Sequence, residues 1–232
     1  MSTISQKQPQ TDLQHNVSLQ PIDESYRIEL IRKSIHLTSI IIPIVYFFTP
    51  RSLALEILIP LTFSFFIVDI SRYYSRPLEL WFNKTFGWLL RKHEYGKEHK
   101  RLNGATYVLL AGTIAVFIFP KLIAVTSFSI LILCDLTAAL IGKRFGKHRL
   151  FKKSIEGTLA FLITGILIII LLPKIEYSPV EYVVCAAAVA CGALVEALPI
   201  DIDDNLSIPL TVGAIMWAGY AIFLPVINLN KF

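Results

Sequence analysis

Charged residues are scarce in this sequence. Only 17% of its 232 residues are Asp, Glu, Lys or Arg, whereas 54% are hydrophobic and the mean hydropathy is +0.60. A soluble globular domain has a markedly more polar composition. The sequence therefore predicts an integral membrane protein.

Cysteine is also scarce. The three cysteines, Cys134, Cys185 and Cys191, all lie inside apolar runs and show no spacing typical of metal ligands. This pattern excludes a disulfide framework and argues against a zinc site.

The sequence lacks the phosphate-binding loop of soluble nucleotide-binding enzymes. Its nearest approach is Gly142-Lys-Arg-Phe-Gly146-Lys147-His148. The two glycines are too close together, and His148 stands where a Ser or Thr would bind magnesium. If the protein binds a nucleotide, the ends of membrane helices would have to hold it instead.

Apolar runs predict an all-α, polytopic fold with about seven transmembrane helices. Residues 1–24 are polar, without the apolar core of a signal peptide, and are expected to form a disordered cytosolic tail. Residues 25–232 are expected to form a single membrane-embedded domain, with a helix starting near Tyr26. The expected spans are 35–48, 53–70, 104–119, 121–141, 157–172, 180–198 and 208–226.

The long connection at residues 71–103 also carries an apolar pattern. Trp81, Thr85, Trp88 and Leu89 recur at helical spacing after Pro77. This spacing predicts an amphipathic helix lying in the membrane interface. Such a helix could serve as a simple anchor or as a portal for lipid.

The basic residues indicate an orientation. With a cytoplasmic N-terminus, 18 of the 22 Lys and Arg residues fall on the inner side, and only Arg51, Lys121, Lys174 and Lys231 remain outside. This asymmetry is what membrane topology requires. It explains the net charge of +5 without a nucleic-acid partner, and it brings the motifs described below to one cytosolic face.

Asp135 is the most unusual residue. A carboxylate inside a membrane helix costs about 2.5 to 3.5 kcal/mol, so it needs a cation or metal as partner. Ala138, Ala139 and Gly142 follow it on the same helical face and leave room for close backbone approach. A basic loop and the segment from Lys153 to Gly157 come next. A structural ion pair is the alternative for Asp135, and helix packing is the alternative for Gly142 and Gly146.

A second acidic region lies between Pro199 and Pro209, in a loop expected on the inner side. Its carboxylates can bind a hard divalent cation such as Mg²⁺. Phosphoryl transfer needs such a cation, positive charge on the phosphates and an acceptor for the hydroxyl proton. We assign Asp135 and Asp204 as metal ligands with Asp203 and Glu156 as alternates, Arg32, Lys33 and Lys153 as phosphate contacts, and Asp204 or Glu196 as the base.

Four motifs in order give the chain a family resemblance from about residue 27 to its end. They are Arg32-Lys33 with His36, Arg101-Leu-Asn-Gly104-Ala-Thr106, the pattern D-x-x-A-A-x-x-G-x-x-x-G with K-S-x-E-G from Asp135 to Gly157, and Glu196-Ala-Leu-Pro199 with Asp203-Asp204-Asn205. The chain resembles the family of dolichol kinase, phytol kinase and CTP-dependent diacylglycerol kinase, which is related to CTP-using cytidylyltransferases.

The resemblance implies a kinase that moves the γ-phosphate of CTP, or of UTP, to the hydroxyl of a membrane lipid alcohol. Asp135, Asp204 and Glu196 are then the expected catalytic residues. A cytidylyltransferase making a CDP-lipid and a carrier or channel are the alternatives. The expected nucleotide-binding and phosphate-binding residues are Arg32, Lys33, Gly142, Gly146, Lys153, Ser154, Glu156, Gly157 and Asn205.

Overall fold

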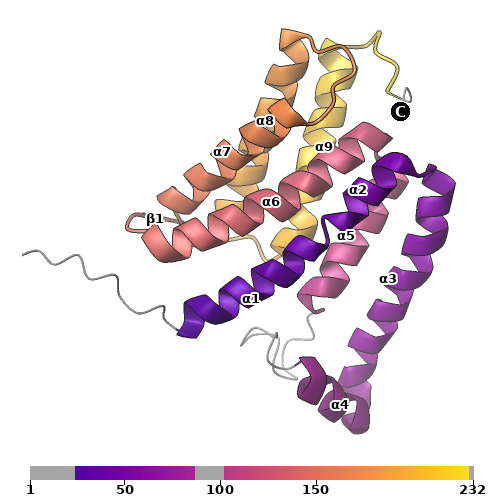
Figure 1. The fold of residues 1–232 in the computed structure, drawn as a ribbon, viewed down its shortest axis with the longest axis vertical. Coiled ribbons are helices and arrows are strands. Elements are labelled where there is room, and N and C mark those ends of the chain that lie inside the picture. Colours follow the sequence, from indigo (N-terminus) through magenta and orange to yellow (C-terminus); the bar gives the residue numbers. More distant parts are fainter. Residues whose placement is uncertain (1–23, 87–101, 230–232) are drawn as a thin grey trace, which may run out of the picture.

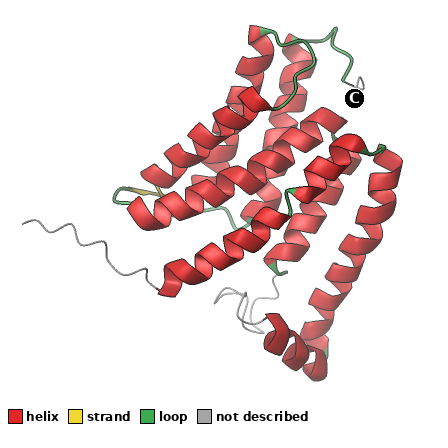
Figure 2. Ribbon diagram, in the orientation of Figure 1, coloured by secondary structure: helices red, strands yellow, loops and turns green. Residues whose placement is uncertain are grey.

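The computed structural model describes residues 24–86 and 102–229, which form a bundle of helices (Figures 1 and 2). Residues 1–23 of the predicted tail, together with Trp88, Leu89 and Arg101, lie outside the described residues. The helices are α1 (Glu24–Thr38), α2 (Ile41–Phe48), α3 (Arg51–Tyr74), α4 (Arg76–Phe86), α5 (Gly104–Ile118), α6 (Lys121–Phe145), α7 (Ile155–Leu171), α8 (Pro179–Ala197) and α9 (Asp204–Phe223). A two-stranded hairpin of β1 (Arg149–Leu150) and β2 (Lys153–Ser154) connects α6 to α7.

The all-α polytopic prediction is confirmed. Within the described parts of the chain, five apolar segments are long enough to cross a membrane: Glu29–Phe48, Arg51–Tyr74, Lys121–Phe145, Pro179–Ala197 and Asp204–Phe223. Two shorter apolar helices, Gly104–Ile118 and Ile155–Leu171, occupy the other two predicted spans. Each predicted span therefore coincides with helical structure.

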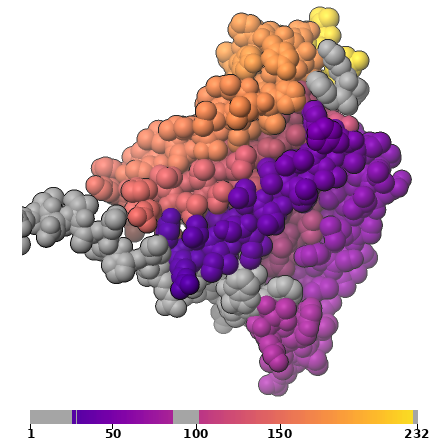
Figure 3. All heavy atoms as spheres, viewed as in Figure 1, coloured from indigo at the N-terminus to yellow at the C-terminus, as the bar shows by residue number. Residues whose placement is uncertain are grey.

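Helix α6 is the centre of the bundle. It packs against α1, α2, α5, α7 and α9, and in Figure 3 the atoms of α1 and α2 cover one of its sides. Ile123, Ile130 and Ile132 are fully buried. A helix that is apolar on every side is stable only when it is surrounded. Its central position carries Asp135 into the interior of the protein.

Helix α3 has the opposite character. It lies at the edge of the bundle, and Ile57, Phe63 and Ile67 are each about half exposed. A row of exposed large apolar side chains is unfavourable in water but suits contact with lipid. Its buried residues include a charged pair, Asp69 and Arg72, close to its C-terminal end. These two residues form an ion pair, with Arg72 Nε 2.9 Å from Asp69 Oδ1.

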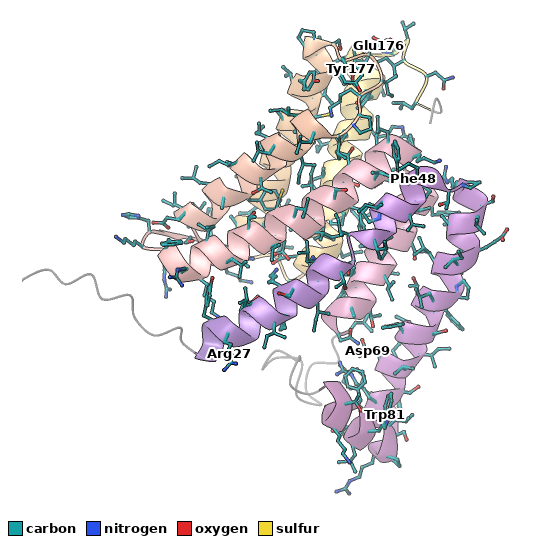
Figure 4. All side chains as sticks on the ribbon, in the orientation of Figure 1. Arg27, Phe48, Asp69, Trp81, Glu176 and Tyr177 are labelled. Atoms are coloured by element: carbon teal, nitrogen blue, oxygen red, sulfur yellow. The ribbon has the colours of Figure 1, made fainter. Side chains whose placement is uncertain are left out.

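The bundle has two ends, which Figure 4 marks with labelled side chains. Arg27, Asp69 and Trp81 lie towards one end, whereas Phe48, Glu176 and Tyr177 lie at the other. At this second end Glu181 is fully buried and accepts hydrogen bonds from the N–H groups of residues 175–177 and from the Tyr220 hydroxyl. Satisfied in this way, Glu181 stabilises a loop, so this buried carboxylate has a structural explanation.

Several predicted boundaries were wrong. Pro209 does not mark the start of the last helix, because α9 begins at Asp204 and includes Pro209. Pro209 lies inside the helix, where it removes one backbone hydrogen bond, and such prolines are tolerated in membrane helices because neighbouring groups satisfy the freed backbone. Asp203 and Asp204 are therefore the N-cap and first residue of α9 rather than loop residues. Helix α6 likewise continues past residue 141 to Phe145, and the β1–β2 hairpin was not predicted.

Candidate active site

Asp135 pairs with a lysine from a helix distant in sequence. The Lys33 ammonium on α1 donates a hydrogen bond to Asp135 Oδ2, and both residues are buried, with exposures of 3% and 5%. His36, one turn further along α1, places its Nε2 3.9 Å from the same oxygen. The pair compensates both charges in the interior, where a lone charge would be far more costly. The structural ion pair that was the alternative explanation for Asp135 is therefore present.

Lys153 lies among three carboxylates. Its ammonium is 2.6 Å from Glu196 Oε1 on α8 and 3.0 Å from Asp204 Oδ2 at the start of α9. Burial alone would lower the pKa of Lys153, but the charges of Asp204, Glu196 and Asp135 outweigh burial and raise it above its ordinary value. Lys153 is therefore a permanent cation at neutral pH.

Glu196 is almost completely buried, with 2% of its surface exposed. Its Oε1 contacts Lys153, whereas no described residue hydrogen-bonds its Oε2. A buried carboxylate oxygen without a partner is costly and calls for a specific explanation. The Glu196 Oε2 atom is available to a ligand group that enters beside Lys153.

The β1–β2 hairpin delivers Lys153 to this position. Ser154 follows it as the N-cap of α7 and accepts a hydrogen bond from the N–H of Gly157 at 3.1 Å. This bond satisfies one of the free N–H groups at the start of a helix. Lys153 therefore lies directly before a residue that is hydrogen-bonded to the first turn of α7.

Gly142 and Gly157 allow α6 and α7 to touch. A Cβ on Gly157 would lie 2.9 Å from the carbonyl oxygen of Ala138 and 3.2 Å from Gly142 Cα. Because these are backbone atoms, they cannot move aside cheaply. The helix-packing alternative for Gly142 is thus supported by a direct contact between the two helices.

Gly157→Ala should lower the free energy of unfolding by about 1 to 3 kcal/mol, because the added methyl group overpacks the α6–α7 crossing. Thermal unfolding in detergent would measure the loss. Gly104→Ala is the matched control, since its Cβ would meet only Asn205 Nδ2, at 3.7 Å. Equal stability of the two variants would contradict this prediction.

A cavity of about 530 Å³, named cavity 1 here, opens beside Asp135. One part of its wall is apolar and comes from α1, α3, α4 and α5. The other part is polar and contains six predicted site residues from three separate regions: Arg32, Lys33, Asp135, Asp203, Asp204 and Asn205. The structure therefore brings these regions together, as the topology predicted.

A second cavity of about 340 Å³, cavity 2, lies between the α6–α7 crossing and the hairpin. Its wall includes the other predicted residues Gly142, Gly146, Lys153, Ser154, Gly157 and Glu196. Five further basic side chains surround it: Lys143, Lys147, His148, Arg149 and Lys152. Lys153 connects the cavities, because it lines cavity 2 and contacts Asp204 in the wall of cavity 1.

Two of the predicted residues have other contacts. Glu156 lines neither cavity, and its carboxylate lies 2.9 Å from His148 Nδ1. Asp203 lines cavity 1, but its Oδ1 caps α9 by accepting from the backbone N–H and side-chain amide of Asn205. These contacts give both carboxylates a structural role.

The predicted magnesium ligands do not form a ready-made site. Asp135 is held by Lys33, Asp204 by Lys153, and Asp203 by the start of α9. Within residues 24–86 and 102–229, no group of three His, Cys, Asp or Glu side chains is placed to hold a metal ion. The assignment of Mg²⁺ ligands stays a prediction.

Asn103, which belongs to the second of the four sequence motifs, also lines cavity 1. The N–H of Asn103 donates to Asp69 Oδ2 at 2.5 Å, while its side chain caps α5 by accepting from the N–H of Thr106. The Asn103-x-x-Thr106 spacing was a usable capping signal. The contact with Asp69 spans 34 residues, and only the folded chain reveals it.

Comparisons with known proteins give three informative relatives. The chain is 26% identical to CTP-dependent diacylglycerol kinase 1 of Schizosaccharomyces pombe over 66% of this chain and 74% of that protein. It is 30% identical to a dolichol kinase of the same organism over 60% of this chain and 29% of the relative. It is 33% identical to a phytol kinase of Synechocystis over 39% of this chain and 41% of the relative.

No protein-family profile matches the chain, and no solved structure matches it. The three relatives are all named as kinases, and the alignment with the diacylglycerol kinase covers most of both proteins. Identity is modest throughout. These curated homologues nevertheless confirm the resemblance that the four motifs carried, and they support placing the chain with the polyprenol kinase family.

Proposed function

We propose that this protein is a phosphotransferase that moves the γ-phosphate of CTP to the hydroxyl group of a membrane lipid alcohol. The observation that carries the proposal is the pair of cavities on either side of Lys153. Cavity 1 is largely apolar and suits a lipid, whereas cavity 2 is basic and suits a triphosphate. Both substrates would meet at the Lys153–Asp204 contact.

The assignment of substrate classes rests on the relatives as well as on the cavities. The relatives are named as kinases of diacylglycerol, dolichol and phytol, which are all lipids with a hydroxyl group. The diacylglycerol kinase is named as CTP-dependent, which supports CTP as donor. The lysines and arginine around cavity 2 supply the positive charge that phosphates need.

Asp204 is the proposed base. It is partly exposed in the wall of cavity 1, where an acceptor hydroxyl would lie, and it contacts Lys153. The hydroxyl oxygen forms a bond to the γ-phosphorus and transfers its proton to the Asp204 carboxylate. The bond between the γ-phosphorus and the β,γ-bridging oxygen breaks, and CDP leaves with the electron pair.

Lys153 and Glu196 act on the donor side of the reaction. The Lys153 ammonium neutralises the negative charge of the transferred phosphate, which is the main requirement of phosphoryl transfer. Glu196, which lines cavity 2, holds this ammonium in place together with Asp204. Glu196 is therefore a positioning residue rather than a second base.

Magnesium is proposed to arrive as part of the substrate, bound to the phosphates of CTP. This proposal fits the carboxylates, each of which already has a partner within the protein. The predicted inner location of the basic residues supports a site that faces the cytosol, where the nucleotide is found.

The decisive experiment supplies purified protein with CTP labelled at either the α- or the γ-phosphate and with a panel of lipid alcohols together with phosphatidic acid. The proposal expects γ-label in the lipid and release of CDP. Transfer of α-label to a phospholipid acceptor, with release of pyrophosphate, would identify a cytidylyltransferase instead. No transfer of either label to any lipid would reject both enzymes.

A further inference from the structure

Cavity 1 has two chemically different parts. Its polar part contains Lys33, Asp135 and Asp204. Its apolar part is lined by six large side chains, and we name it the chain groove: Ile35 on α1, Phe65 and Val68 on α3, Trp81 and Phe82 on α4, and Val108 on α5. Such a division suits an amphipathic ligand whose polar group lies beside the carboxylates.

The chain groove opens towards the side of the bundle. Ile35, Phe65 and Val68 are 44%, 42% and 42% exposed, and Trp81 is 52% exposed. Phe65 and Val68 lie on α3, the helix whose outer face suits contact with lipid. An open apolar groove on this surface would be filled by hydrocarbon rather than by water, because water gains little from apolar walls.

The wall formed by α4 is held in a fixed position. Arg72 on α3 lies over the ring of Phe82, with Cζ 4.7 Å from the ring centre. Its guanidinium is in turn fixed by Asp69, which is fully buried and also binds the N–H of Asn103 at the start of α5. One buried ion pair thus joins three helices around the groove and fixes its width.

We propose that the chain groove binds the hydrocarbon chain of the acceptor lipid, which enters sideways from the bilayer between α1 and α3. The Asp69–Arg72 pair acts as a positioning element for the α4 wall of this groove. This inference rests on the proposed function, since it places the chain of the same acceptor whose hydroxyl lies beside Asp204. The groove, and not the charged site, then selects acceptors by their chain.

The test fills the groove and measures chain-length selectivity. Val68→Trp is compared with Ile67→Trp, its neighbour on α3, which is similarly exposed but does not line cavity 1. The acceptors are geraniol, farnesol and geranylgeraniol, in order of increasing length. Val68→Trp should reduce kcat/KM for geranylgeraniol relative to geraniol about tenfold, with an unchanged KM for CTP. Ile67→Trp should keep the selectivity of the wild type.

Arg72→Lys provides a second test of the wall. Lysine keeps the charge beside Asp69 but loses the planar stacking on Phe82, so chain selectivity should weaken while the KM for CTP stays constant. The inference is overturned if Val68→Trp and Ile67→Trp have the same selectivity as the wild type. If the wild type phosphorylates no alcohol at all, the proposed function itself fails, so the two failures are distinguishable.

Discussion

Lys153→Met should reduce phosphate transfer by about a hundred- to a thousandfold, the usual effect of removing one group that stabilises charge in a transition state. Methionine keeps much of the length of the side chain but removes its ammonium. The γ-phosphate then loses its cation, and Glu196 and Asp204 lose the cation that both contact. The KM for CTP should rise more than the KM for the lipid, because Lys153 lines cavity 2. Steady-state kinetics in detergent with both substrates varied would measure this difference.

The matched control for this substitution is Lys121→Met. Lys121 is the first residue of α6, at the opposite end of that helix from the site, and it lines neither cavity. Its removal should leave both KM values and kcat unchanged. If Lys153→Met keeps the wild-type KM for CTP and its kcat, Lys153 has no part in the reaction.

Lys33→Met should lower the free energy of unfolding by about 3 to 5 kcal/mol, the cost of leaving a buried carboxylate without its partner. Asp135 is only 5% exposed and has little access to water. The double variant Lys33→Met/Asp135→Asn removes both charges, so most of the stability should return. Denaturant unfolding of the two single variants and the double variant in detergent gives the coupling between the residues.

Activity separates a structural role of this pair from a functional one. Asp135→Asn should abolish phosphate transfer while the protein still inserts into membranes and stays folded, because the carboxylate faces cavity 1. The double variant should be stable but inactive. A double variant with full activity would show that Lys33 and Asp135 only hold α1 against α6.

The helical organisation was predictable because it depends on local composition. Each apolar run long enough to cross a bilayer became a helix, and the scarcity of charge left no alternative to a membrane fold. The start of α9 was misplaced because Pro209 was taken as a boundary, whereas this proline lies inside the helix, as membrane helices tolerate. The β1–β2 hairpin was missed because strands of two residues have no detectable period.

The sequence predicted which charged residues line the two cavities better than it predicted which of them form ion pairs. Charged residues are unusual in apolar surroundings, so Asp135 and Glu196 stood out from the sequence alone. Which cation each would contact depends on how α1, the hairpin, α6, α8 and α9 meet in space. The sequence could not show that Lys33 pairs with Asp135, or that Lys153 lies between Glu196 and Asp204.

Asp135, Asp204 and Glu196 each contact a lysine in the structure without substrates. Asp204 and Glu196 share Lys153, so a phosphate that approaches this ammonium competes with both of them. Binding of the donor would then weaken the Lys153–Asp204 contact and leave the Asp204 carboxylate able to accept a proton. Donor binding would in this way prepare the base for the acceptor hydroxyl.

The central claim is that regions distant in sequence form one site that opens on a single side of the membrane. The most direct measurement is the labelling of single cysteines in a cysteine-free background, in sealed vesicles, with a reagent that does not cross the membrane. Lys152→Cys beside cavity 2 and Ile202→Cys before α9 should be labelled from the same side, and Glu176→Cys from the other. Labelling of Lys152→Cys and Ile202→Cys from opposite sides would contradict a shared site.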